Sequence, residues 1–233
     1  MSEPVWALSA RGVSRWFRLD HQKITAVDKV SLDIPTGTII ALVGQSGSGK
    51  STLLSLLGGL DRPSEGQVFL DGKLFGDPVL VSESQRAELR QRHIGFVFQA
   101  YNLISTLTAV ENVMFPLRLA KLRPALCREK AMHLLGEMGV ADRAKHLPSQ
   151  LSGGEQQRVA IARAIVHEPG IILADEPTGS VDSKNGAIIM DLITGLCRKR
   201  GKTVVLVTHD PSVAEVADRI VHLKDGKIAG VEA

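Results

Sequence analysis

Residues 44–51 read Gly-Gln-Ser-Gly-Ser-Gly-Lys-Ser, which is the spacing of a loop that binds phosphate groups. Glycines let the backbone close around phosphate oxygens, and the N–H groups at a helix N-terminus attract anions. We expect Lys50 to neutralise the β- and γ-phosphates of a nucleotide and the Ser51 hydroxyl to bind Mg²⁺. The expected nucleotide-binding residues here are Gly44, Gln45, Ser46, Gly47, Ser48, Gly49, Lys50, Ser51 and Thr52. A chance glycine-rich turn is the alternative, which the predicted strand before the loop and helix after it disfavour.

Two adjacent carboxylates, Asp175 and Glu176, follow the apolar run at residues 171–174. A buried strand that ends in acidic residues indicates a site at the carboxyl edge of a sheet. We expect Asp175 to hold Mg²⁺, directly or through water, and Glu176 to orient and deprotonate an attacking water molecule. Alone, the pair is compatible with a simple acidic turn. Beside a phosphate-binding loop, the catalytic interpretation is favoured.

A second helix N-terminus is predicted at residues 151–158, which read Leu-Ser-Gly-Gly-Glu-Gln-Gln-Arg. Ser152 and Glu155 have the spacing of a capping box. Gly153 and Gly154 would leave the N–H groups of the first turn bare, so that the helix dipole faces an anion. One alternative is that the motif only caps its helix. Together with the first loop, it suggests two surfaces that hold one nucleotide.

The elements that must position these motifs alternate between strand and helix, which predicts an α/β fold. Short apolar runs of the kind found in buried parallel strands occur at 38–43, 171–174 and 203–208. Asp-Gly pairs at 71–72 and 225–226 predict hairpins near the two ends of the chain.

The middle of the chain has a different pattern. Residues 85–166 are mainly helical, with one predicted strand at 94–98, and Thr108 and Glu111 have capping-box spacing. We therefore expect a helical insertion that begins near Gln99. The expected organisation is a single domain, with its core at about 1–98 and 166–233 and a helical subdomain at about 99–165.

Composition excludes several classes of protein. The chain has 233 residues, of which 44% are hydrophobic and 23% charged, so disordered, collagen-like and coiled-coil chains are excluded. Its apolar runs are far shorter than the ~20 residues of a membrane span, and residues 1–4 lack the features of a secretory signal. Cys127 and Cys197 do not have the spacing of a disulfide scaffold or zinc site. A net charge of +3 permits an acidic partner or an anionic membrane surface without requiring nucleic acid.

Taken together, the motifs resemble those of ATP-binding cassette (ABC) ATPases, the nucleotide-binding subunits of ABC transporters. Residues 151–156 match the signature motif of that family, and the resemblance covers nearly the whole chain. It implies ATP and Mg²⁺ as ligands and a P-loop NTPase (RecA-like) core, with an antiparallel β subdomain and an inserted helical subdomain. It also implies that Gln99 touches Mg²⁺ and the water, that Asp182 belongs to the D-loop, and that His209 contacts the γ-phosphate. The expected catalytic residues are then Glu176, His209, Lys50 and Gln99, and the expected metal ligands Ser51, Gln99 and Asp175.

Two positions depart from the usual family pattern. The aromatic residue that stacks on adenine is usually a tyrosine, whereas here the candidates are Phe17 and Trp16. Counting back from residues 31–34 favours Phe17, although either ring could instead pack within an N-terminal sheet. The D-loop reads Ser-Val-Asp in place of the commoner Ala-Leu-Asp, which leaves Asp182 in position.

A narrower resemblance to the lipoprotein-releasing and macrolide-export ATPases (the LolD/MacB subgroup) is carried by residues 56–61, 96–99, 107–113 and 174–179. Because one chain carries a single phosphate loop and a single signature, we expect ATP-driven closure of a homodimer, with each ATP between residues 44–52 of one chain and 152–155 of the other. Pairing with a paralogue is the alternative. The expected partners are a transmembrane permease subunit and a periplasmic adaptor reached through it, without nucleic acid. The permease would dock beside Tyr101, Leu103 and Ile104, although these side chains could instead pack in the core of the helical insertion. The expected location is the cytoplasmic face of the inner membrane, in export or periplasmic mechanical work. The alternatives are a cell-division-type membrane complex and a DNA- or ribosome-associated ATPase.

Overall fold

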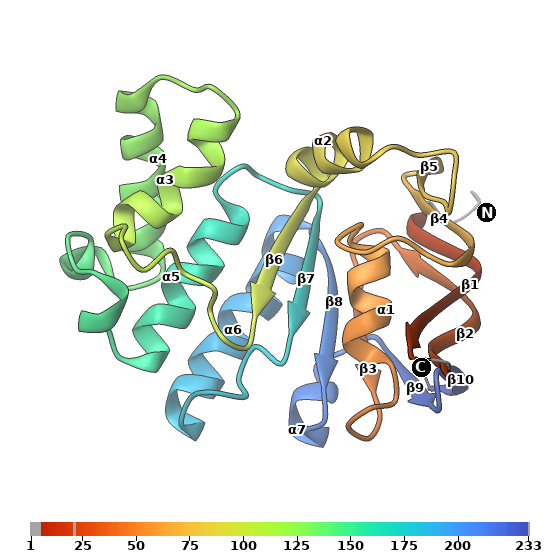
Figure 1. The fold of residues 1–233 in the computed structure, drawn as a ribbon. Helices are drawn as coiled ribbons and strands as arrows, with labels where there is room; N and C mark the ends of the chain where they lie inside the picture. Colours follow the sequence, from red (N-terminus) through yellow and green to blue (C-terminus); the bar gives the residue numbers. More distant parts are fainter. Residues whose placement is uncertain (1–5, 21, 233) are drawn as a thin grey trace, which may run out of the picture.

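The computed structural model describes residues 6–20 and 22–232, which form two sheets and several helices (Figure 1). The strands are β1 (Trp6–Leu19), β2 (Gln22–Pro35), β3 (Ile39–Val43), β4 (Glu65–Leu70), β5 (Lys73–Gly76), β6 (Ile94–Phe98), β7 (Ile171–Asp175), β8 (Thr203–Thr208), β9 (Arg219–Lys224) and β10 (Lys227–Glu232). The helices are α1 (Lys50–Leu57), α2 (Glu83–His93), α3 (Ala109–Leu119), α4 (Pro124–Glu137), α5 (Gly153–Ile165), α6 (Ser183–Arg200) and α7 (Pro211–Ala214), with short 3₁₀ turns η1 (Ala141–Arg143) and η2 (Pro148–Gln150). None of the helices in the described ranges is long and apolar enough to cross a bilayer.

The larger sheet brings the carboxyl ends of its central strands to one edge. Its strand order is β10-β9-β3-β8-β7-β6, and β9, β3, β8, β7 and β6 run parallel. The side chains of β8 are buried along its whole length, as expected for a parallel strand that is covered on both faces. The loops that follow β3, β7 and β8 therefore leave the sheet at the same edge, at the bottom of Figure 1.

Helix α1 forms the centre of the core between the two sheets. Four of its leucines are buried: Leu53, Leu54, Leu56 and Leu57. They pack in one hydrophobic cluster with residues of β7 and β8 and of the smaller sheet, which has the order β2-β1-β4-β5. Because α1 begins at the end of the glycine-rich loop, this core fixes the loop against the large sheet.

Helices α3, α4, α5 and α6 form a second core on the other face of the large sheet. The group of α3 and α4 lies to one side of the sheet in Figure 1. Helix α3 begins at the predicted capping box, in which Thr108 and Glu111 satisfy each other's backbone N–H groups. Asn112 is fully buried. Its side-chain amide accepts from the backbone N–H of Ile104 and donates to the backbone carbonyl oxygen of the same residue, so the loop before α3 is held against the helix.

The predicted hairpins are confirmed. Asp71 and Gly72 join β4 to β5, and both have positive φ, which is the geometry of a type I′ turn. Asp225 and Gly226 do the same between β9 and β10. The two 14-residue strands at the start of the chain were not predicted in detail, because register shifts interrupt their alternation. The expectation about residues 1–4 lies outside the described residues.

Candidate nucleotide-binding and hydrolysis site

The glycine-rich loop joins β3 to α1, and its backbone requires glycine. Gly49 caps α1 with a φ of 99°, and a Cβ there would lie 2.2 Å from the carbonyl oxygen of Ala26. The Lys50 side chain turns back into the loop, where Nζ donates to the carbonyl oxygens of Gly44 (2.8 Å) and Gln45 (2.9 Å). The loop therefore holds a fixed positive charge beside the free N–H groups of a helix N-terminus, which suits a phosphate group.

Ser51 and Asp175 meet at the carboxyl edge of the sheet. The Ser51 hydroxyl donates to Oδ1 of Asp175 over 3.0 Å. Burial raises the pKa of Asp175 above its ordinary value. Hydroxyl and carboxylate oxygens are the donors that Mg²⁺ prefers, so these two side chains fit that ion. Within the described ranges no three His, Cys, Asp or Glu side chains form a metal group, so Mg²⁺ would also need oxygen ligands from phosphate.

Glu176 and His209 lie at the ends of neighbouring parallel strands, β7 and β8. The φ of Glu176 is 48°, in the left-handed region that non-glycine residues rarely adopt, and its N–H donates to the carbonyl oxygen of Val207. Nδ1 of His209 lies 2.7 Å from Oε1 of Glu176. The turn after β7 thus directs the glutamate out of the sheet edge and towards the histidine. Gln99 approaches from β6, with its Nε2 2.9 Å from where a Cβ on Gly179 would lie.

A pocket of about 780 Å³ brings these groups together. It is lined by Phe17, Ile24, Ala26, Ser46, Gly47, Gly49, Lys50, Ser51, Thr52, Gln99, Asp175, Glu176 and His209. Phe17 lies at the pocket and is 43% exposed, with the Arg15 guanidinium 4.5 Å from its ring centre. Trp16 is not among the lining residues, and its ring instead contacts the ammonium of Lys23 at 3.8 Å. The structure therefore offers Phe17, rather than Trp16, as the aromatic surface beside the phosphate loop.

The second predicted helix N-terminus lies elsewhere on the chain. Ser152 and Glu155 form the predicted capping box at the start of α5. The hydrogen bond from Arg143, assisted by those from Ser152, lowers the pKa of Glu155 to about 2. Asp182 caps α6 through the N–H of Asn185. None of residues 152–155, nor Asp182, lines the pocket described above.

Comparison with known proteins agrees with this arrangement. The sequence profile of the ABC transporter family matches residues 27–179. The chain belongs to the ABC transporter family. The expected fold class and the resemblance to ABC ATPases are both confirmed, and the chain is an ATPase cassette of this family.

Individual relatives of this cassette fall into two kinds. It is 45% identical over 225 residues to the macrolide export ATP-binding/permease protein MacB of Shewanella sp. (strain W3-18-1), which covers 97% of this chain and 34% of that protein. The cassette thus spans about a third of the length of the MacB relatives. It is also 45% identical to the uncharacterized ABC transporter ATP-binding protein MJ0796 of Methanocaldococcus jannaschii, over 95% of this chain and 94% of that protein. A solved dimeric structure of MJ0796 matches with a TM-score of 0.90 at 43% identity, over 97% of each chain, and a second, bound to ADP and Pi, matches equally well.

Sequence reasoning missed the side chains that shape the signature turn of the cassette. A Cβ on Gly153 would lie 2.7 Å from the hydroxyl of Tyr101, and one on Gly154 would lie 2.4 Å from Oδ1 of Asn185. A side chain at either glycine would therefore have to displace a close neighbour within the same chain, Tyr101 or Asn185. For Asn185 a signal was present in the sequence, because Asp182 and Asn185 have the spacing of a helix N-cap and its partner.

The three residues expected beside a docking groove have different surroundings in the structure. Ile104 lines a groove between α2, β6 and α3. Leu103 instead packs against the core of α3 to α6, and the Tyr101 hydroxyl donates to the carbonyl oxygen of Ser180. The reason is that the chain turns sharply at Tyr101, which directs successive side chains to different surfaces.

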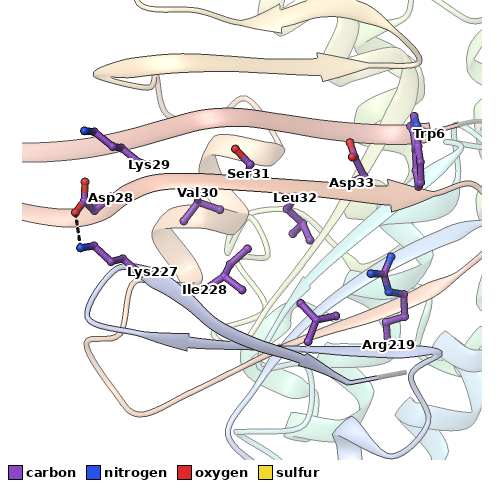
Figure 2. Close-up of a pocket in the computed structure, with 11 residues that line it drawn as sticks. Trp6, Asp28, Lys29, Val30, Ser31, Leu32, Asp33, Arg219, Lys227 and Ile228 are labelled. Carbon is purple, nitrogen blue, oxygen red and sulfur yellow. Dashed lines mark ion pairs between the residues drawn. The ribbon is translucent and has the colours of Figure 1, made fainter.

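Another hollow of the cassette lies between the edge strands of the two sheets, β2 and β10 (Figure 2). Its volume is about 650 Å³, and an ion pair between Asp28 and Lys227 closes one end. Val30, Leu32 and Ile228 line it between the strands. None of the predicted site residues lines this hollow, so it is separate from the nucleotide site.

Proposed function

We propose that this cassette binds and hydrolyses ATP in a head-to-tail dimer of two identical chains. The observation that carries the proposal is the separation of its two anion-binding surfaces. The pocket at the phosphate loop contains Lys50, Ser51, Asp175 and Glu176 but no residue of the signature turn at 152–155. In an isologous pair, the signature turn of each copy completes the site of the other, so one two-fold interface closes both sites.

The roles proposed within one site follow from its geometry. Lys50 and the loop N–H groups hold the phosphates, and the Phe17 ring stacks on adenine. Ser51, Gln99 and Asp175 would hold Mg²⁺, which supplies positive charge to the β- and γ-phosphates. Glu176 accepts a proton from the attacking water. His209, which the family resemblance places at the γ-phosphate, also lies against this carboxylate, with Nδ1 2.7 Å from Oε1, and can orient it.

In this proposal the cassette acts with a membrane-spanning permease at the cytoplasmic face of the inner membrane. Support comes from the MacB relatives, whose name combines an ATP-binding and a permease function in one protein. The docking surface would be the groove of about 540 Å³ beside Ile104, where Phe115 and Leu119 are 37% and 57% exposed. The complex would carry out export or mechanical work in the periplasm, with a periplasmic adaptor bound to the permease.

Co-purification tests the permease proposal. The tagged chain is isolated from membranes of its own cells in mild detergent, and a multi-span protein with a large extracytoplasmic domain is expected at equal stoichiometry. Changing Phe115 and Leu119 together to serine should remove this protein. A control variant carries serine at Val79 and Leu80, which are 81% and 70% exposed but lie outside the groove. Recovery of the tagged chain with ribosomes or nucleic acid, or equal loss of the partner in both variants, would contradict the proposal.

A further inference from the structure

The chain turns sharply just after β6, at two consecutive residues with left-handed backbone. Tyr101 has a φ of 60° and Asn102 a φ of 51°, although neither is glycine. This conformation is unfavourable for residues with a Cβ and persists only where neighbouring groups hold it. The turn lies between β6 and α3, so whatever holds it fixes the course of the chain between these two elements.

Arg163 of α5 supplies the holding groups. Its guanidinium donates through Nη2 to the carbonyl oxygen of Tyr101 at 2.8 Å and through Nη1 to that of Asn102. A planar guanidinium presents parallel donors, so one side chain can fix two adjacent carbonyl groups at once. Helix α5 begins at the signature turn. The arginine therefore ties the segment after Gln99 to the helix that carries that turn.

The Tyr101 side chain makes a second connection. Its hydroxyl donates to the carbonyl oxygen of Ser180, in the D-loop, at 2.9 Å. The same hydroxyl lies beside Gly153, where a Cβ would approach it to 2.7 Å. Burial raises the pKa of the Tyr101 hydroxyl above its ordinary value of 10.0, at which it is already protonated at neutral pH. One phenol thus lies beside the signature turn and bonds to the D-loop.

We propose that Tyr101 and Arg163 are positioning residues that set the signature turn and the D-loop at the spacing needed to meet the second chain. This inference rests on the proposed dimer, because neither Gly153 nor Ser180 lines the chain's own nucleotide pocket. Loss of the contacts should therefore leave nucleotide binding by the single chain intact. It should weaken ATP-driven pairing, since the surface that receives the partner's nucleotide is no longer held.

The test compares two constants in a Glu176→Gln background, which prevents hydrolysis. Affinity for a fluorescent ATP analogue, trinitrophenyl-ATP, is measured with dilute chain, and ATP-driven dimerisation is measured by light scattering across protein concentration. With Tyr101→Phe added, the analogue should bind with unchanged affinity. The protein concentration needed for half-dimerisation should rise about tenfold, because the Ser180 carbonyl loses its donor.

Arg163→Met provides the second variant, since its thioether keeps an unbranched side chain but has no donor for either carbonyl. Like Tyr101→Phe, it should weaken dimerisation and leave the affinity for the ATP analogue unchanged. The control is Arg200→Lys, at an exposed arginine of α6 that pairs with Glu137, and it should change neither constant. The inference would be overturned if Tyr101→Phe dimerised as readily as its parent. It would also be overturned if the affinity for the ATP analogue fell as much as dimerisation did. If Glu176→Gln alone stays monomeric with ATP, the proposed dimer fails instead, so the two failures are distinguishable.

Discussion

Nδ1 of His209 lies 2.7 Å from Oε1 of Glu176, across the ends of β8 and β7. A carboxylate that acts as a base can only accept hydrogen bonds, and the histidine tautomer that suits this role donates from Nδ1. The backbone assists this contact, because the N–H of Glu176 donates to Val207 of β8. Sheet pairing thus brings the two side chains together, and the histidine can fix the carboxylate that we propose as the base.

Removing the imidazole should impair turnover more than binding. In His209→Ala, kcat should fall about 10- to 100-fold while KM changes little, because the carboxylate loses its orientation but the phosphate loop is untouched. Phosphate release under saturating ATP measures the effect. His133→Ala, an exposed histidine of α4, serves as the control. A KM effect that matches the kcat effect would place His209 in binding instead.

The aromatic ring at the pocket should determine nucleotide affinity. Phe17→Ala should raise the Kd for ATP about 5- to 150-fold, which corresponds to the ~1–3 kcal/mol of one base–aromatic stack. Phe17→Tyr should retain affinity. Trp16→Ala, on the neighbouring residue, should have a small effect because Trp16 does not line the pocket. Isothermal titration provides the Kd values, and a larger effect at Trp16 would reverse the assignment.

The native Asp175 carboxylate should support ATP hydrolysis but lower the free energy of unfolding at neutral pH. Burial raises its pKa, so the folded chain binds this proton more tightly than the unfolded chain, and unfolding free energy falls as pH rises through the folded-state pKa. At pH 7, Asp175→Asn should raise the Tm by about 2–4 °C. It should also lower kcat with Mg²⁺ about 100-fold. Calorimetry and phosphate release measure the two effects. Asp191→Asn, on the exposed face of α6, should alter neither, and a lower Tm for Asp175→Asn would refute the account of its burial.

The capping carboxylate of α5 should give the opposite pH dependence. The bond from Arg143 lowers the pKa of Glu155 from 4.5 to about 2, so its stabilising effect is complete above about pH 4.5 and is lost as the pH falls towards 2. Urea unfolding at pH 7 and pH 3 should show a smaller pH dependence for Glu155→Gln than for the parent chain. The variant should also lose about 1 kcal/mol at pH 7. Identical pH dependences would show that this carboxylate is not held in the folded state.

Local patterns allowed much of the fold to be predicted from the sequence. The phosphate loop, the paired carboxylates and the Asp-Gly hairpins each depend on residues within about ten positions of each other, so spacing alone identifies them. The neighbours of the signature turn could not be identified in this way, since the bond from Tyr101 to Ser180 spans 79 residues. The choice between Phe17 and Trp16 also stayed open, because a shift of one residue along a strand exchanges its two faces.

The most direct test of the central claim is the mass of Glu176→Gln in solution with ATP and Mg²⁺. The proposed head-to-tail dimer predicts a shift, by light scattering, from the 25.1 kDa of one chain to twice that mass. Reversal on removal of ATP is expected, and Lys50→Ala in the same background should prevent the shift. A single-chain mass at saturating ATP would contradict the claim that two cassettes close around the nucleotide.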